Sequence, residues 1–210
     1  LLARHNADVV QPTFPLGPFR EALAARSRDR ERAQRGIAAD EVLVVVVGPL
    51  RCGVRQPEIA EAYGLLADHA RGRTRIVFLD EGMAAAADRI GYLAAADIAL
   101  CSEPVEVAWR GLEEAMAAGL PLLVAHWPST PEVVRENVNA LLYPPGNAPA
   151  LARRLALLVA DAGWRRALGA RSLAVLESRP SFARMVDVHA RRLREAVNFA
   201  VGDEGQSRGG

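Results

Sequence analysis

The feature that most constrains the fold is an unbroken apolar run, Val42-Leu-Val-Val-Val-Val-Gly48. A strand with one face in water alternates apolar and polar side chains, whereas a strand covered on both faces is apolar throughout. Covered strands of this kind are typical of parallel sheets, whose neighbouring strands are joined by helical crossovers. The run therefore predicts an α/β fold.

Four further short apolar runs follow, and segments with helical spacing separate them. The expected strands lie at 76–79, 98–101, 121–125 and 140–143, and the expected helices at 57–70, 84–96, 110–118 and 131–137. This alternation predicts a doubly wound parallel sheet, Rossmann-like in architecture, with right-handed crossovers. Residues 148–201 are expected to form a helical C-terminal extension that is broken near Gly163 and Pro180.

The two ends of the chain differ from its centre. Three prolines within residues 11–19 predict an extended connector, and the arginine- and glutamate-rich segment 20–35 predicts a solvated helix. We therefore expect a connector and exposed helix over 1–36, a Rossmann-like domain over 37–201 and a disordered tail over 202–210. Because the chain starts at Leu1, in what resembles mid-protein sequence, we expect a fragment of a longer protein.

Charge and cysteine content exclude several classes of function. The 26 basic and 25 acidic residues leave a net charge of +1, which argues against a dedicated nucleic-acid binder. Every basic residue is arginine, so chemistry that depends on lysine is excluded. Cys52 and Cys101 are too few for a disulfide framework, and with four scattered histidines they predict no metal site. No apolar run is long enough to span a bilayer, and we expect a cytoplasmic protein.

In a doubly wound sheet the ligand lies outside the carboxyl ends of the strands. The loop after the first strand contains Gly48, Arg51, Gly53 and Arg55. Glycine lets the backbone approach a ligand, and a guanidinium can bind a phosphate group in bidentate fashion. The loop matches neither a Rossmann glycine fingerprint nor a Walker loop, so a surface loop with solvated arginines is an equal alternative.

The loop after the third strand carries more chemistry. Glu106 is expected in the loop and Glu114 just inside the next helix, with the amides near Arg110 and Gly111 forming the amino end of that helix. A helix amino end favours a diphosphate, and the carboxylates could accept hydrogen bonds from sugar hydroxyls. The alternative is that both glutamates are caps or solvated charges. Glu113 is expected at the surface.

Residues after the other strands are weaker candidates. His126 follows the fourth strand and could contact a base or a phosphate, although a structural role is the more common one. Trp109 and Trp127 could stack on a ligand or pack in the core. Asp97 is expected to end its helix rather than to bind a metal.

Five segments together resemble a known family. They are Gly48-x-Leu-Arg51, Glu106-x7-Glu114 with the following Ala-Met-Ala-Ala-Gly119-Leu-Pro121, Pro131-Glu-Val-Val134, Asn137 to Gly146, and Ser181-Phe-Ala-Arg184. In order and spacing they resemble the donor-binding half of a retaining GT-B glycosyltransferase of the GT4 family, over roughly residues 9–198. The resemblance implies a nucleotide-sugar ligand and an N-terminal acceptor-binding domain, either missing from this chain or supplied by another subunit. It also implies a possible peripheral membrane contact through that half.

The resemblance also implies roles for individual residues. Glu106 would bind the donor sugar, Glu114 the ribose, and Arg51 and Arg55 the diphosphate, with no metal or other cofactor required. The reaction would be glycosyl transfer with retention of configuration, and this fragment alone would show no turnover because the acceptor half is absent.

Departures from the family pattern leave alternatives open. Val107 and Trp109 stand where the family has glycines, Ser129 and Thr130 replace its paired glycines, and its phosphate-loop lysine is missing. A degenerate GT-B-like binding module is therefore the first alternative. A nucleotide-sugar epimerase or a glycoside hydrolase is the second, although no further motif supports it.

Overall fold

A computed structural model describes residues 14–48, 57–79, 86–128, 130, 134–179, 186–187 and 190–194; the side chains of 86–87 and 105–107 are excepted. The chain forms two compact units. One comprises Leu1–Pro15 with Arg179–Gly210, and its residues 186–187 and 190–194 are helical. The other, Leu16–Ser178, contains the sheet and all the elements named below.

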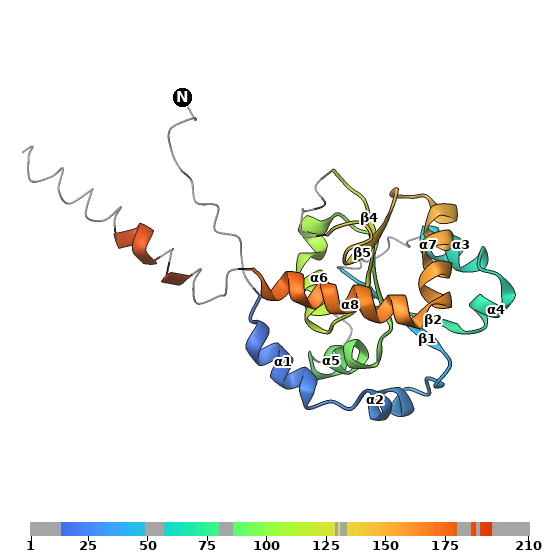
Figure 1. Cartoon of the computed structure of the whole chain (residues 1–210), viewed down its shortest axis with the longest axis horizontal. Helices are drawn as coiled ribbons and strands as arrows, with labels where there is room; N and C mark the ends of the chain where they lie inside the picture. The colour runs from blue at the N-terminus through green and yellow to red at the C-terminus, as the bar shows by residue number, and fades with distance from the viewer. Residues whose placement is uncertain are drawn as a thin grey trace, which may run out of the picture. The chain divides into compact units, whose positions relative to one another are not determined.

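The larger unit is built on a five-stranded sheet (Figure 1). Its strands are β1 (Val42–Val47), β2 (Thr74–Leu79), β3 (Ile98–Cys101), β4 (Leu122–Ala125) and β5 (Ala140–Tyr143). All pairs are parallel and the order is β2-β1-β3-β4-β5. Every residue of β1 is buried, with Val45 paired to Val77 on one side and Ala99 on the other. The predicted doubly wound parallel sheet is confirmed.

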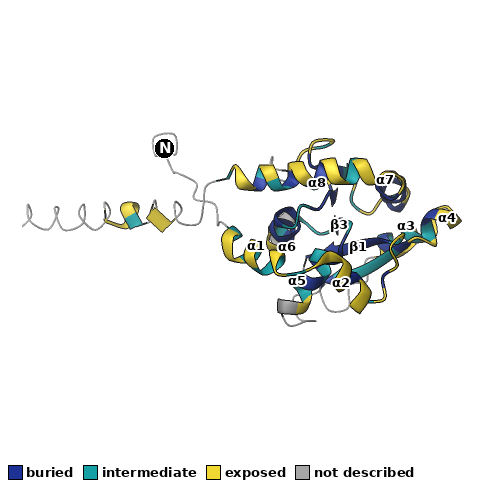
Figure 2. Cartoon of the chain, turned by 60° about the horizontal axis from the view of Figure 1, so that its bottom comes forward, coloured by how far each residue is buried: buried dark blue, intermediate teal, exposed yellow. Residues whose placement is uncertain are grey.

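Helices cover both faces of this sheet (Figures 1 and 2). One face packs against α3 (Pro57–Gly64), α4 (Asp68–Arg71) and α7 (Ala148–Ala160), and the other against α5 (Ala86–Ala95) and α6 (Val105–Ala117). Outside them lie α1 (Leu16–Ala24) and α2 (Arg28–Gln34), which contact α5, while α8 (Ala162–Glu177) contacts α6, α7 and β4. The dark sheet strands at the centre of Figure 2 show that the core lies between these layers.

The amino-terminal segment differs from the sequence prediction. The expected connector over 11–19 is wrong from Leu16 onward, because α1 begins there with Pro18 in its first turn, where proline is tolerated. The predicted helix over 20–35 is two helices, and Ser27 caps the second by accepting the Arg30 N–H at 3.5 Å. Most of this segment is solvated as expected, but Glu31 and Arg32 are buried.

Several other helix and strand boundaries differ from those predicted. The expected helix over 57–70 is divided into α3 and α4, and β2 begins two residues earlier than predicted. The expected short helix over 131–137 is absent from its described residues 134–137, where Glu136 forms an isolated bridge with Ala140 and a turn begins at Asn137 with φ +59°. The predicted break near Gly163 is confirmed, since Asp161 ends α7 and caps α8, while the break expected near Pro180 lies outside the described residues.

Asp97 joins α2 to the sheet. It follows α5, and its Oδ1 accepts a hydrogen bond from Arg28 Nη2 at 2.7 Å. Its Oδ2 accepts from Arg32 Nη1 at 3.0 Å and from the Leu43 amide at 2.8 Å. The buried Arg32 also donates to the carbonyls of Ala38 and Glu41. One carboxylate therefore connects α2, the start of β1 and the turn before β3.

Candidate functional site

The strand order locates the binding crevice. Connections run in opposite directions from β1 and β3, and in doubly wound sheets ligands bind at such a switch point, beyond the carboxyl ends of the strands. Val46 pairs with Leu100, so Gly48 and Ser102 emerge side by side at this edge. The strands that precede the two predicted loops are therefore neighbours, while residues 49–56 of the first loop lie outside the described residues.

The helix that follows β3 begins earlier than predicted. Pro104 is its N-cap and α6 starts at Val105, so the expectation that amides near Arg110 and Gly111 form the amino end is wrong. Ala108 is the first residue to donate within the helix, to the Pro104 carbonyl at 3.3 Å. The amides at this end are therefore those of residues 105–107. Glu106 lies in the first turn rather than in a loop, and its side chain is outside the described set.

Two glycines hold this helix against β1. Gly48 has φ +125°, and a Cβ added to it would lie 3.1 Å from the Cβ of Ala108. A Cβ on Gly111 would lie 3.0 Å from the Cβ of Val47 and 3.1 Å from the Gly48 nitrogen. These distances are shorter than side chains normally allow. Gly48 and Gly111 are therefore points of close approach that bring α6 against the end of β1.

Glu114 is buried beside these glycines, with 3% of its surface exposed. Its Oε2 accepts from Arg89 Nε at 2.5 Å, and its Oε1 from Arg110 Nε at 3.1 Å. Arg89 comes from α5 and also donates to the carbonyl of Leu79, the last residue of β2, at 3.0 Å. The carboxylate therefore lies at the carboxyl edge of the sheet between two guanidinium groups.

Sequence reasoning did not identify Arg89. Its Nη2 is buried, and among the described residues it has no hydrogen-bond partner. A Cβ on Gly111 would lie 3.4 Å from this nitrogen, which places a spare donor next to the Gly48–Gly111 contact. Arg89 precedes Glu114 by 25 residues, and no local pattern in the sequence indicates that the two residues meet.

The remaining predicted residues are more dispersed. His126 is exposed at the end of β4, with its amide bonded to the Tyr143 carbonyl at 2.8 Å. Trp127 packs against the core and donates its indole N–H to the Ser102 carbonyl at 3.1 Å. Arg51 and Arg55 lie outside the described residues. The structure thus brings Gly48, Arg110, Gly111 and Glu114 together and places His126 beyond β3 from them.

Burial raises the pKa of two groups near this edge. Cys101 is fully buried, as predicted, and burial raises the pKa of its thiol to about 12. Burial and the neighbouring Glu103 carboxylate raise the pKa of Glu58, at the start of α3, above its usual value. Glu113 was expected at the surface, but it is 5% exposed.

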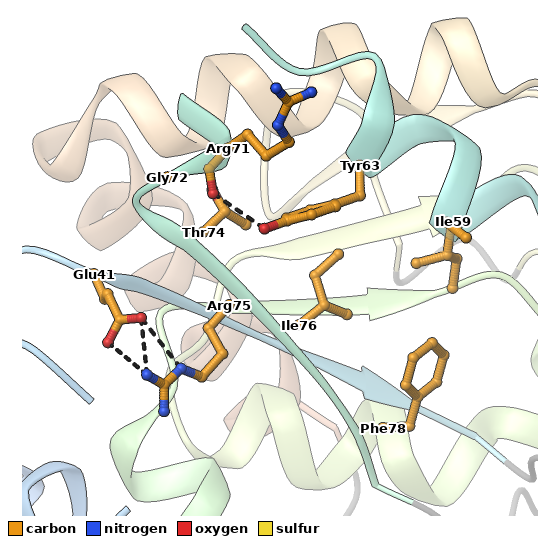
Figure 3. A pocket seen from close by; sticks show the side chains of 10 residues that line it. Glu41, Ile59, Tyr63, Arg71, Gly72, Thr74, Arg75, Ile76 and Phe78 are labelled. Carbon is orange, nitrogen blue, oxygen red and sulfur yellow. Dashed lines mark hydrogen bonds and ion pairs between the residues drawn. The ribbon is translucent and has the colours of Figure 1, made fainter. Parts of the chain in front are cut away.

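A hollow of about 500 Å³ lies over the outer strand β2 (Figure 3). Ile59, Tyr63 and Phe78 form much of its wall. Its polar groups are satisfied within it, because Arg75 pairs with Glu41 at 3.0 Å and Tyr63 donates to the Arg71 carbonyl at 3.2 Å. It therefore offers fewer groups for recognition than the crevice does.

The described ranges contain neither a cluster of metal-ligating side chains nor a helix suited to a bilayer. No group of three or more His, Cys, Asp or Glu side chains could hold a metal ion there. Across the same residues, no helix combines the length and the apolar character that crossing a bilayer requires.

The sheet, its switch point and its helices define the Rossmann-like fold found in the C-terminal domain of GT-B glycosyltransferases. The sequence model for "Glycosyl transferases group 1" matches residues 33–173, more than half of the chain. The chain belongs to this family. No curated protein matches it.

Solved structures share this fold at low identity. Sucrose-phosphate synthase from Thermosynechococcus elongatus aligns with TM-score 0.63 and 20% identity, over 81% of this chain and 49% of that one. The C-terminal domain of the group 1 glycosyl transferase LpcC from Francisella tularensis aligns with TM-score 0.63 and 16% identity, over 75% of this chain and 94% of that one. HepE from Anabaena, solved with UDP, aligns with TM-score 0.67 and 17% identity, over 87% of this chain and 56% of that one. The chain thus spans about half the length of the first and the third.

Proposed function

We propose that this chain is the donor-binding part of a retaining, GT4-like glycosyltransferase that takes a sugar from a nucleotide-sugar. The observation that carries the proposal is the amino end of α6, held against β1 by Gly48 and Gly111 beside the Glu114 carboxylate. Membership of the group 1 family supports sugar transfer. The similar HepE structures, solved with UDP and with UDP-glucose, support a nucleotide-sugar as ligand.

The proposed diphosphate site is the first turn of α6. Amides of residues 105–107 and the helix dipole favour negative charge there, and Arg51 and Arg55 would add guanidinium groups. Charge grows on the departing diphosphate during glycosyl transfer, so donors aimed at it stabilise the transition state more than the ground state. Glu106, in the same turn, is the proposed contact to the donor sugar, and His126 is a further proposed contact at the edge of the crevice.

Glu114 is the proposed ribose ligand, with Arg89 as its positioning residue. Both carboxylate oxygens already accept from arginines, yet each oxygen has a second lone pair. Arg110 is 76% exposed and can swing away, whereas Arg89 is 13% exposed and anchored to Leu79. A ribose diol would therefore replace Arg110 while Arg89 keeps the carboxylate in place. The spare Nη2 of Arg89, next to Gly111, supplies positive charge in a chain that lacks the family's phosphate-loop lysine.

Calorimetric titration with UDP, GDP and ADP tests this proposal. We expect one of the three to bind, and binding to be lost in Glu114→Gln and Arg51→Ala but kept in Arg171→Ala, an exposed position on α8. Equal affinity in all four proteins would contradict the assignment. The chain alone is expected to show no transfer.

The degenerate binding module remains a second candidate because Glu114 is buried and paired on both oxygens. It predicts that none of the three nucleotides binds to folded protein. An epimerase instead predicts turnover of a nucleotide-sugar without an acceptor.

A further inference from the structure

A polar pocket of about 310 Å³ opens at the amino ends of the strands. The turn before β3, the turn from α6 to β4 and the first turn of α8 form its walls, together with Arg28 of α2. The crevice described above lies beyond the carboxyl ends of the same strands. The two sites are therefore at opposite edges of the sheet.

Arginines dominate the charge of this pocket. Arg28, Arg165 and Arg166 line it, and Asp97 is its acidic residue. Asp97 already accepts from Arg28, from the buried Arg32 and from the Leu43 amide. Its one negative charge is therefore used in holding α2, and it leaves the guanidinium groups of α8 without a matching carboxylate in the pocket.

The surroundings of Arg165 reflect this excess of positive charge. Its Nη1 donates to the carbonyls of Leu158 and Val159 at the end of α7, which fixes the side chain at the pocket wall. Burial lowers the pKa of Arg165, Asp97 opposes that shift, and Arg28, Arg73 and Arg166 lower the pKa further. Three cations and one already paired anion thus act on the same guanidinium.

The start of α8 also borders the pocket through Ala162, its first residue. The capping carboxylate Asp161 accepts from the Trp164 amide at 2.8 Å and offsets the partial positive charge of this helix end, so the arginine side chains supply the positive charge of the pocket. Arg166 is exposed, and within the described part of the chain no ion pair engages it.

We propose that this pocket binds a phosphate group. A phosphate carries up to two negative charges and several acceptor oxygens, which suits a pocket that is lined by three arginines and by one carboxylate that is already paired. The pocket volume equals that of about ten water molecules at ~30 Å³ each, so a phosphate monoester fits. The group could come from a soluble phosphate compound or from an anionic lipid headgroup, which present the same chemistry.

Titration with inorganic phosphate at low ionic strength tests the pocket. We expect Arg166→Glu to weaken binding about tenfold or more, as losing one charge-assisted contact implies, and Arg166→Gln to weaken it less. Arg171→Glu makes the same charge change at an exposed position of α8 outside the pocket, and it should leave the affinity unchanged. Circular dichroism and thermal melting of each variant confirm that it is folded.

Two further arms separate the sources and the sites. Vesicles of phosphatidylcholine, with and without phosphatidic acid, show whether a lipid phosphate is bound and whether Arg166→Glu abolishes that binding. Arg51→Ala removes an arginine of the proposed nucleotide crevice and should leave phosphate affinity at this pocket intact. Binding that Arg51→Ala abolishes and Arg166→Glu spares, or no binding of phosphate or vesicles, would overturn the proposal.

Discussion

Arg89 and Glu114 form a largely buried ion pair between α5 and α6, with Nε and Oε2 2.5 Å apart. The side chains are 13% and 5% exposed. Removing one partner of such a pair leaves a desolvated charge, which is far more costly than losing a surface contact.

Arg89→Met should therefore lower the free energy of unfolding by about 3 kcal/mol. Arg110 also pairs with Glu114 but is 76% exposed, so Arg110→Met should cost less than about 1 kcal/mol. Urea unfolding of both variants checks the difference. Equal losses would show that Arg89 does not hold the carboxylate in the way proposed here.

Gly111→Ala should destabilise the protein by roughly 1 to 2 kcal/mol, because the new methyl group would meet Val47 and the Gly48 backbone. The matched control is Gly64→Ala at the end of α3, where no heavy atom lies within 4 Å of the added Cβ. That variant should be neutral or slightly stabilised. Thermal melting of both variants measures the difference. A melting temperature of Gly111→Ala equal to that of the wild type would mean that α6 does not pack closely against β1.

Glu58 should make stability depend on pH. Because its pKa is raised in the folded protein, the folded state holds this proton more strongly than the unfolded chain does. The stabilisation is present in acid and is lost as pH rises from the usual value of 4.5 through the raised pKa.

Glu58→Gln should accordingly raise the melting temperature at neutral pH and flatten its fall between acid and neutral pH. Glu61→Gln is the control, at an exposed position on the same helix. A wild-type slope retained in Glu58→Gln would assign the effect to another group.

Cys101 should resist alkylation in the native protein, because it is buried and its pKa of about 12 keeps it as the thiol at pH 8. The measurement is the rate of iodoacetamide labelling in a Cys52→Ser background, with and without denaturant. Labelling that is as fast in native as in denatured protein would contradict the buried position.

The sheet could be predicted because its strands are encoded locally. Val42–Val47 is apolar at every position, and a strand covered by helices on both faces requires that pattern. The start of α6 could not be predicted, because Pro104 offers no side-chain cap that would mark it. The start of α2 did carry a signal, Ser27, which the prediction of one continuous helix overlooked.

The sequence predicted the edge of the sheet at which the candidate site lies, but only some of the residues that meet there. Its place follows from the alternation of strands and helices, which directs the loops after Gly48 and Cys101 to one edge. The partners of Glu114 depend on how α5 lies against α6. The burial of Glu113, which was expected at the surface, depends on which residues cover α6. Such facts belong to tertiary packing rather than to spacing along the chain.

The position of Asp97 has a practical meaning for anyone who shortens this protein. The family match begins at residue 33, after both arginines that Asp97 holds. A truncation to that boundary would strip the carboxylate of Arg28 and Arg32 and leave the Leu43 amide as its one remaining partner of the three. The smallest autonomous folding unit should therefore start upstream of α2, even though homology alone would place the cut inside it.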